Sequence, residues 1–440
     1  MSKRITALIL ALAVVFGSVI SLSSCSPAFS DWLENYTKGD ESQDNDTPPQ
    51  NNEENEEPKN DPTDSTPPSD DSTSTEDEEE NKEESTPPLV FDGEYYPGQG
   101  SVAIEDIAPK NRTLLSTVVV TSKFGTTPSA GAGVFYKLDK NSGDAYIITN
   151  YHVVFSKNYG ICSSASIYLY GMTYSDYAIP ATVIGGSVNF DIAVLKVSGS
   201  ELIKNSYATE AVLGNSDHVR VFDEVFAVGN PEGYGFAVTE GIVSVDSESL
   251  DMTGCDGSAI TLRVMRVSAA INEGNSGGGL YDENGKLVGI VCAKRIGADI
   301  DNMAYAIPVN LAKNLADNII DNCDGTSVTK VQRALIGIEI TAKVVGLVAD
   351  PETGELYKAE CVKIGNVQST SLARNMLAVG DIINSITVDG VKVNVTRMHH
   401  VTDHMLNARK GSTVSLNITR GENNLNVEFI VPPSAITSEK

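Results

Sequence analysis

The chain has 440 residues, of which 41% are hydrophobic and 21% are charged, and its formal net charge is −27 at pH 7. This length and apolar content can supply two or more packed cores. Nucleic-acid binding depends on neutralising phosphates, and this acidic chain shows no basic stripe, so we exclude nucleic acid as a partner.

Residues 1–25 predict export from the cytoplasm. Lys3 and Arg4 precede a long apolar run and then small residues, which is the layout of a signal peptide. Residues 22–25 resemble the lipobox of bacterial lipoproteins, in which the cysteine, here Cys25, is acylated and becomes the first residue of the mature protein. We therefore expect an extracytoplasmic protein anchored to the cell membrane by that lipid. The alternative is an uncleaved transmembrane anchor over residues 5–22.

Residues 26–90 predict a disordered, acidic linker. Within them, residues 31–88 hold 21 acidic and 3 basic side chains and almost no apolar ones. Such a segment cannot bury enough surface to offset the entropy of ordering it. We expect a spacer without a functional site.

Residues 91–325 predict a mainly β domain. About a dozen short apolar or alternating runs are separated by Gly, Asn, Asp and Ser turns, and the only convincing helix runs over 308–321. The strands fall into two groups with a break near residues 198–222. This pattern predicts two six-stranded antiparallel β-barrels.

Three residues of this domain predict nucleophilic catalysis. Ser276 lies in a glycine-rich turn before an apolar strand, a setting that exposes a hydroxyl beside backbone N–H groups. Of the five histidines, only His152 and His218 fall in the β region. His152 follows a strand end directly and is the candidate base, and we expect His218 to be a structural residue. Asp191 begins another apolar strand and is suited to orient an imidazole. The order of the three predicts a catalytic cleft between the barrels.

Five segments together resemble the HtrA (Deg) family of trypsin-like serine proteases: TNYHVV, DIAVLKV, GNPEGYGFAVTEGIVS, AAINEGNSGGGL and AYAIPVN. The resemblance runs from about residue 112 to about residue 431. It implies His152 as general base, Asp191 as its orienting carboxylate and Ser276 as nucleophile. It also implies an oxyanion hole made by the backbone N–H groups of Gly274 and Ser276, with Asn275 between them.

Some positions depart from the family pattern. Glu273 stands where the family often has Pro or a basic residue, Gly279 where Pro is usual, and Ser268 where Asp is common. The changes at Glu273 and Gly279 predict a looser loop around the nucleophile. The resemblance further implies that Ile271 and Met303 line the primary specificity pocket.

Residues 332–432 resemble the PDZ domain that follows the protease in this family, and we expect 433–440 to be a tail. The resemblance implies a small α/β module that binds C-terminal peptides. Its carboxylate-binding loop would be Leu335, Ile336, Gly337 and Ile338, with the next strand pairing with the peptide. The alternative is a small lid without a ligand.

We expect no cofactor and no metal. His400, Asp403 and His404 share one face of a predicted helix at a spacing that can bind zinc, but a third convincing ligand is missing, and a polar helix face explains the pattern. Once Cys25 is lipidated, five thiols remain, and the sequence does not determine how they pair.

These expectations combine into an endopeptidase for protein quality control, acting on unfolded, misfolded or damaged exported proteins through an acyl-enzyme. The alternative is a proteolytically weak chaperone or peptide-binding adaptor on the same scaffold. The resemblance also implies a homotrimer, for which residues 91–100, with Phe91, Tyr95 and Tyr96, are the candidate contact.

Overall fold

A computed structural model describes residues 103–172, 177–230, 236–272, 274–294, 303–349 and 354–439. All of them belong to one compact unit, Pro88–Lys440. The predicted signal peptide with Cys25, the acidic linker and the candidate trimer contact at 91–100 lie outside the described residues, as does Glu273. None of the helices in the described ranges has the length and apolar content needed to cross a membrane.

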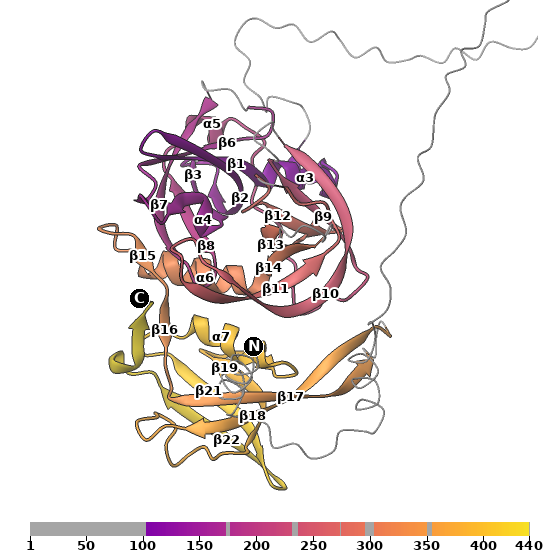
Figure 1. Cartoon of the computed structure of the whole chain (residues 1–440), viewed down its shortest axis with the longest axis vertical. Coiled ribbons are helices and arrows are strands. Elements are labelled where there is room, and N and C mark those ends of the chain that lie inside the picture. The colour runs from indigo at the N-terminus through magenta and orange to yellow at the C-terminus, as the bar shows by residue number, and fades with distance from the viewer. Residues whose placement is uncertain are drawn as a thin grey trace, which may run out of the picture. The chain divides into compact units, whose positions relative to one another are not determined.

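The first barrel is a ring of six antiparallel strands in the order β7-β6-β1-β2-β3-β8, closed by pairing between β7 and β8 (Figure 1). Val118, Val120 and Ile147 are fully buried inside it, because β-branched side chains pack well on a pleated surface. Its strands are β1 (Thr117–Phe124), β2 (Thr127–Asp139), β3 (Asp144–Thr149), β6 (Ser164–Tyr168), β7 (Ile179–Ser187) and β8 (Ile192–Val197). The short elements around it are η1 (Ile104–Asp106), α3 (Pro109–Ser116), α4 (Tyr151–Val154), β4 (Phe155–Ser156), β5 (Gly160–Ile161) and β15 (Thr329–Lys330), which pairs with β7.

The second barrel is closed in the order β10-β11-β14-β13-β12-β9. Its strands are β9 (Glu224–Gly229), β10 (Ala237–Thr253), β11 (Ala259–Val267), β12 (Gly279–Asp282), β13 (Leu287–Lys294) and β14 (Ala304–Pro308). Helix α6 (Val309–Asn322) follows directly, with Pro308 as its N-cap residue. The prediction of a mainly β fold with two six-stranded antiparallel barrels is therefore confirmed.

The two barrels share one apolar core. Between them, residues 198–223 contain only the short helix α5 (Glu201–Lys204), which agrees with the predicted break. The fully buried Tyr281 of the second barrel stacks on Phe226, and its hydroxyl lies 2.9 Å from Thr117 Oγ1 at the start of β1. This packing fixes the strand ends that face each other between the barrels.

The C-terminal module is a six-stranded antiparallel sheet with one helix, as expected of a small α/β module. It contains β17 (Ile338–Ala349), β18 (Leu356–Val367), β19 (Ile382–Val388), β20 (Val391–Asn394), α7 (Met398–His404), η4 (Met405–Asn407), β21 (Thr413–Arg420) and β22 (Asn423–Ile430). The residues after 432 form η5 (Pro433–Ala435) and β23 (Ile436–Ser438), and β23 pairs with β16 (Gln332–Ala334). The chain end thus closes the module beside its first strand.

Candidate active site

His152 and Asp191 meet at the edge of the first barrel. His152 belongs to α4, directly after β3, and Asp191 immediately precedes β8, the strand that pairs with β3. The imidazole Nδ1 lies 2.8 Å from Asp191 Oδ2, and the backbone N–H of His152 donates to Oδ1 of the same carboxylate at 3.0 Å. An ionised carboxylate only accepts hydrogen bonds, so Nδ1 carries the proton and Nε2 keeps its lone pair.

The backbone of Asp191 is held in an unusual conformation. Its φ of 49° lies in the left-handed region, which costs energy for a residue with a Cβ. The Asn150 side-chain amide donates to the Asp191 carbonyl at 2.9 Å, and the Asp191 N–H donates to Val188 at 3.3 Å. The Asp191 side chain is only 8% exposed, whereas that of His152 is 37% exposed. The carboxylate is therefore buried behind a partly exposed imidazole.

The pKa of His152 lies above its ordinary value of 6.5. Burial disfavours the imidazolium, but the charge of Asp191 and its hydrogen bond to the ring favour it more strongly in combination. Because only the neutral imidazole can accept a proton, we expect kcat/KM for peptide cleavage to fall with decreasing pH, with a midpoint above 6.5. Initial rates on a fluorogenic peptide between about pH 5 and 9 check this. A midpoint below 6.5 would contradict the assigned environment.

Ser276 lies in the loop between β11 and β12, against the first barrel. Its carbonyl accepts a hydrogen bond from the N–H of Ala132 on β2 at 2.8 Å. At Gly277, with φ +86°, a Cβ would lie 2.2 Å from the Ala132 carbonyl oxygen and 2.3 Å from Thr149 Oγ1, so only glycine fits. Thr149 ends β3, three residues before His152. The loop therefore brings Ser276 beside the segment that carries the His152–Asp191 pair.

The hydroxyl of Ser276 is partly buried and makes no hydrogen bond to any residue in the described ranges. The three predicted oxyanion-hole residues differ in whether their backbone N–H groups already donate a hydrogen bond. The N–H of Asn275 donates to Asn272 at 3.1 Å, whereas those of Gly274 and Ser276 donate to no described residue. Among the described residues, two N–H groups are therefore available to a developing negative charge, one of them that of Ser276 itself.

Packing from the second barrel holds the loop. The carbonyl of Gly274 accepts from the N–H of Asn230 at 3.3 Å, and a Cβ at Gly229 would lie 2.8 Å from Cα of Asn275. Gly279 is the first residue of β12 and pairs with both neighbouring strands. Ser268 accepts a hydrogen bond from the N–H of Ile242 at 2.9 Å. Gly279 and Ser268, two of the positions that depart from the family pattern, thus both make backbone contacts within the second barrel.

The two residues expected at the specificity pocket pack in different apolar clusters. Ile271 is 3% exposed and belongs to the interior of the second barrel. Met303 packs against the shared core, with its sulfur 3.8 Å from the Tyr305 hydroxyl. Their role in substrate selection stays a prediction.

The predicted carboxylate-binding loop of the C-terminal module borders a groove. Leu335, Ile336, Gly337 and Ile338 line a cavity of about 220 Å³ together with residues of α7 and η4, including Val401 and Met405. The N–H of Leu335 already donates to Ala435 at 2.8 Å, and Gly337 has φ +74°. The groove lies between the start of β17 and α7, where an extended peptide would add to the edge of the sheet.

The structure separates the three residues that share a face of α7 in the sequence pattern. Asp403 forms an ion pair with Arg263 of the second barrel, and His404 Nε2 donates to the carbonyl of Val391 at 2.9 Å. His400 instead turns toward Asp217, as does His399, which the sequence pattern did not single out. The helix periodicity could not reveal this, because the partners lie on other elements of the fold.

Asn150 and Ala132 were also missed from the sequence. Both residues form a hydrogen bond with the backbone of a predicted catalytic residue, and no local sequence pattern indicates such a contact. The five cysteines of the described ranges are all unpaired, and one of them, Cys292, is buried in the core: Cys162, Cys255, Cys292, Cys323 and Cys361.

Comparisons with known proteins found relatives among the serine proteases. A family model described as a trypsin-like peptidase domain matches residues 131–290. The chain is 33% identical over 235 residues to the serine protease Do-like HtrA of Bacillus subtilis (strain 168), covering 53% of this chain and 47% of that one. It is 32% identical over 310 residues to a probable periplasmic serine endoprotease DegP-like of Bartonella henselae, covering 68% of this chain and 52% of that one.

Among solved structures, an HtrA-type protease AlgW with a tripeptide aligns with 76% of this chain and 98% of its own, at 25% identity and a TM-score of 0.47. The chain spans about half the length of the curated relatives it matches, with shares of 47%, 48%, 48% and 41%.

Proposed function

Since this chain belongs to the HtrA family of trypsin-like serine proteases, we propose that it is a membrane-tethered, extracytoplasmic serine endopeptidase that degrades misfolded or damaged exported proteins. The observation that carries the proposal is the pair formed by His152 Nδ1 and Asp191 Oδ2, at 2.8 Å, beside a loop that presents Ser276 with two free backbone donors. Nucleophile, base and orienting carboxylate are the three groups of a serine-protease triad, which carries out acyl transfer.

The chemistry follows from this arrangement. Ser276 Oγ attacks the scissile carbonyl while His152 Nε2 takes its proton, and the oxyanion accepts hydrogen bonds from the N–H groups of Gly274 and Ser276. His152 then gives the proton to the leaving amine, and the acyl-enzyme remains on Ser276. Water attacks the ester after His152 removes its proton, which releases the new carboxyl end and restores the serine. Asp191 stabilises the imidazolium in both halves.

The groove of the C-terminal module suits the end of a peptide chain. An extended peptide would pair with the start of β17, and its terminal carboxylate would reach the loop at 335–338. A solved HtrA-type protease carries a decapeptide, which is in keeping with peptide binding by this family. We propose that the module holds substrates or C-terminal peptides beside the catalytic cleft.

The proposed location rests on the N-terminal sequence. A signal peptide that ends at Cys25 would leave a lipid-anchored protein outside the cytoplasm, or residues 5–22 would remain as an anchor. The name of the Bartonella henselae relative includes the word periplasmic, which agrees with an exported protein. A homotrimer through residues 91–100 is part of the same proposal.

Labelling with a fluorophosphonate tests the proposal directly, because the reagent needs both an activated serine and an oxyanion hole. We expect the full chain to be labelled stoichiometrically, Ser276→Ala not at all and His152→Ala far more slowly. Equal labelling of the wild type and Ser276→Ala would refute the assignment. A folded wild-type chain that binds unfolded protein but takes no label would favour the alternative function as a chaperone or adaptor.

A further inference from the structure

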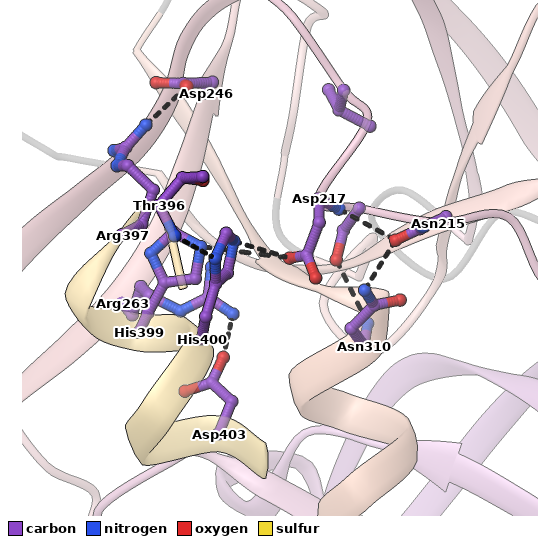
Figure 2. Close-up of polar contacts among 12 residues, drawn as sticks. Asn215, Asp217, Asp246, Arg263, Asn310, Thr396, Arg397, His399, His400 and Asp403 are labelled. Carbon is purple, nitrogen blue, oxygen red and sulfur yellow. Dashed lines mark hydrogen bonds and ion pairs between the residues drawn. The ribbon is translucent and has the colours of Figure 1, made fainter. Parts of the chain in front are cut away.

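Three metal-ligating side chains converge where the C-terminal module meets the second barrel (Figure 2). Asp217 comes from the loop before β9, and His399 and His400 from the first turn of α7. Asp217 Oδ1 lies 3.8 Å from His399 Nε2 and 3.9 Å from His400 Nε2. The two imidazole rings are 4.6 Å apart, at 84° to each other. One ligand atom from each residue lies within 4.8 Å of the other two.

These groups are partly buried and have few polar partners. The side chains of His399 and His400 are 14% and 10% exposed, and that of Asp217 is 28% exposed. Distances of 3.8 and 3.9 Å are too long for hydrogen bonds. Within the described residues, the Asp217 carboxylate has no other ion-pair or hydrogen-bond partner, and neither ring nitrogen of His399 makes a hydrogen bond. A carboxylate and two imidazole nitrogens that face one another without direct hydrogen bonds leave room for a ligand between them.

Two neighbouring guanidinium groups do not fill that role, because each already has its own carboxylate. Arg263 pairs with Asp403, and Arg397 pairs with Asp246 at 2.9 Å. A third, that of Arg220, donates to the backbone carbonyl of Asp217 and leaves the carboxylate of Asp217 to the two imidazoles.

The backbone around His400 selects one ring tautomer. The N–H of Thr396 donates to Nδ1 at 3.2 Å, which places the ring proton on Nε2. Metal binding through Nε2 moves that proton to Nδ1, so ligation requires the ring to give up the hydrogen bond from Thr396.

We propose that Asp217, His399 and His400 form a binding site for a divalent transition-metal ion of the zinc type. Two nitrogens and one carboxylate oxygen are ligands that zinc prefers, with water in the fourth position. Ligand atoms of a tetrahedral zinc site lie about 3.4 Å apart, so the two distances from Asp217 Oδ1, 3.8 and 3.9 Å, need to shorten by roughly half an ångström. The three residues also line cavities of about 400 Å³ and 190 Å³, through which the ion and its water can enter.

The ion would join two parts of the chain. Asp217 belongs to the protease domain, whereas both histidines belong to the helix that borders the peptide groove. Binding would therefore favour the arrangement in which α7 lies against the Asp217 loop, and it would raise the melting temperature by mass action. This site shares His400 with the face formed by His400, Asp403 and His404 in the sequence pattern, but its other two ligands, Asp217 and His399, lie outside that face.

Calorimetric titration of zinc into the full chain tests the proposal, after chelator treatment and without a histidine tag. We expect one ion per chain, and binding weakened by at least about 10- to 100-fold in His399→Gln, His400→Gln and Asp217→Asn. His218→Gln is the matched control, because His218 lines the same cavity outside the cluster. Ser276→Ala should bind zinc like the wild type, which separates this site from the proposed catalytic function.

The cobalt-loaded wild type gives a second readout that needs no variant. We expect a visible spectrum of tetrahedral nitrogen and oxygen coordination, without the absorption of a cobalt–thiolate bond. Melting curves of the metal-free proteins check that each variant is folded. Absence of binding to the wild type, binding that survives all three substitutions, or a thiolate spectrum from one of the five unpaired cysteines would overturn the proposal.

Discussion

Substitution of Ser276 by alanine is expected to lower kcat for cleavage of an unfolded protein by about 10⁶-fold. The variant keeps the backbone donors at Gly274 and at position 276 but has no atom to carry the acyl group. Removal of the base in His152→Ala should cost about as much, and the double variant should lose little more, because the residues act as a unit. Initial rates on a fluorescently labelled unfolded protein measure all three.

The control for this series is the melting temperature of each variant, which shows whether the variant is folded. Ser276 lies in a loop whose position depends on its carbonyl and on Gly277, so alanine should leave the melting temperature nearly unchanged. Substantial cleavage by a folded Ser276→Ala variant would show that another residue carries the acyl group.

Conversion of Asp191 to asparagine is expected to lower kcat by about 10⁴-fold. The asparagine amide can donate to His152 Nδ1, which moves the ring proton to Nε2, the nitrogen that must accept from Ser276. The charge that raises the pKa of His152 is lost as well, so the acid limb of the residual activity should move to lower pH. Rate profiles against pH for the wild type and the variant measure both effects.

Asp139→Asn is the matched control for this substitution. Asp139 is exposed at the end of β2, where its carboxylate accepts from the N–H of Asn141 in the turn. The Asp139→Asn variant should keep kcat within about twofold of the wild type, since surface substitutions of this kind have small effects. A comparable loss of activity in both variants would mean that the role assigned to Asp191 is wrong.

The C-terminal module is held against helix α6, which follows the second barrel, by buried side-chain amides. Asn318 of α6 is fully buried and donates to the carbonyls of Gln332 and Leu406, at 2.8 and 2.9 Å. Asn314 donates to the carbonyl of Asp403 at 2.9 Å. These side-chain amides hold η4 and the end of α7 against the helix that follows the last barrel strand. The proposed metal site lies on the first turn of the same α7.

The sequence by itself determined the fold class and the chain positions of the candidate catalytic groups. Strand alternation and turn residues are local, so they predicted two barrels and the break between them without any knowledge of contacts. The glycine-rich turn at Ser276 and the strand ends at His152 and Asp191 are local patterns too. Together with the order of five motifs, they were enough to identify the family.

Only the tertiary structure decided which distant groups meet these residues. Asn150 holds the carbonyl of Asp191, and Gly277 fits against Ala132, because the two barrels close around one core. On α7, helical periodicity grouped His400 with Asp403 and His404. In the structure, His399 and His400 instead face Asp217, and Asp403 forms an ion pair with Arg263 of the second barrel. Periodicity defines the faces of a helix, but the partner of each face depends on long-range packing, which has no local signature in the sequence.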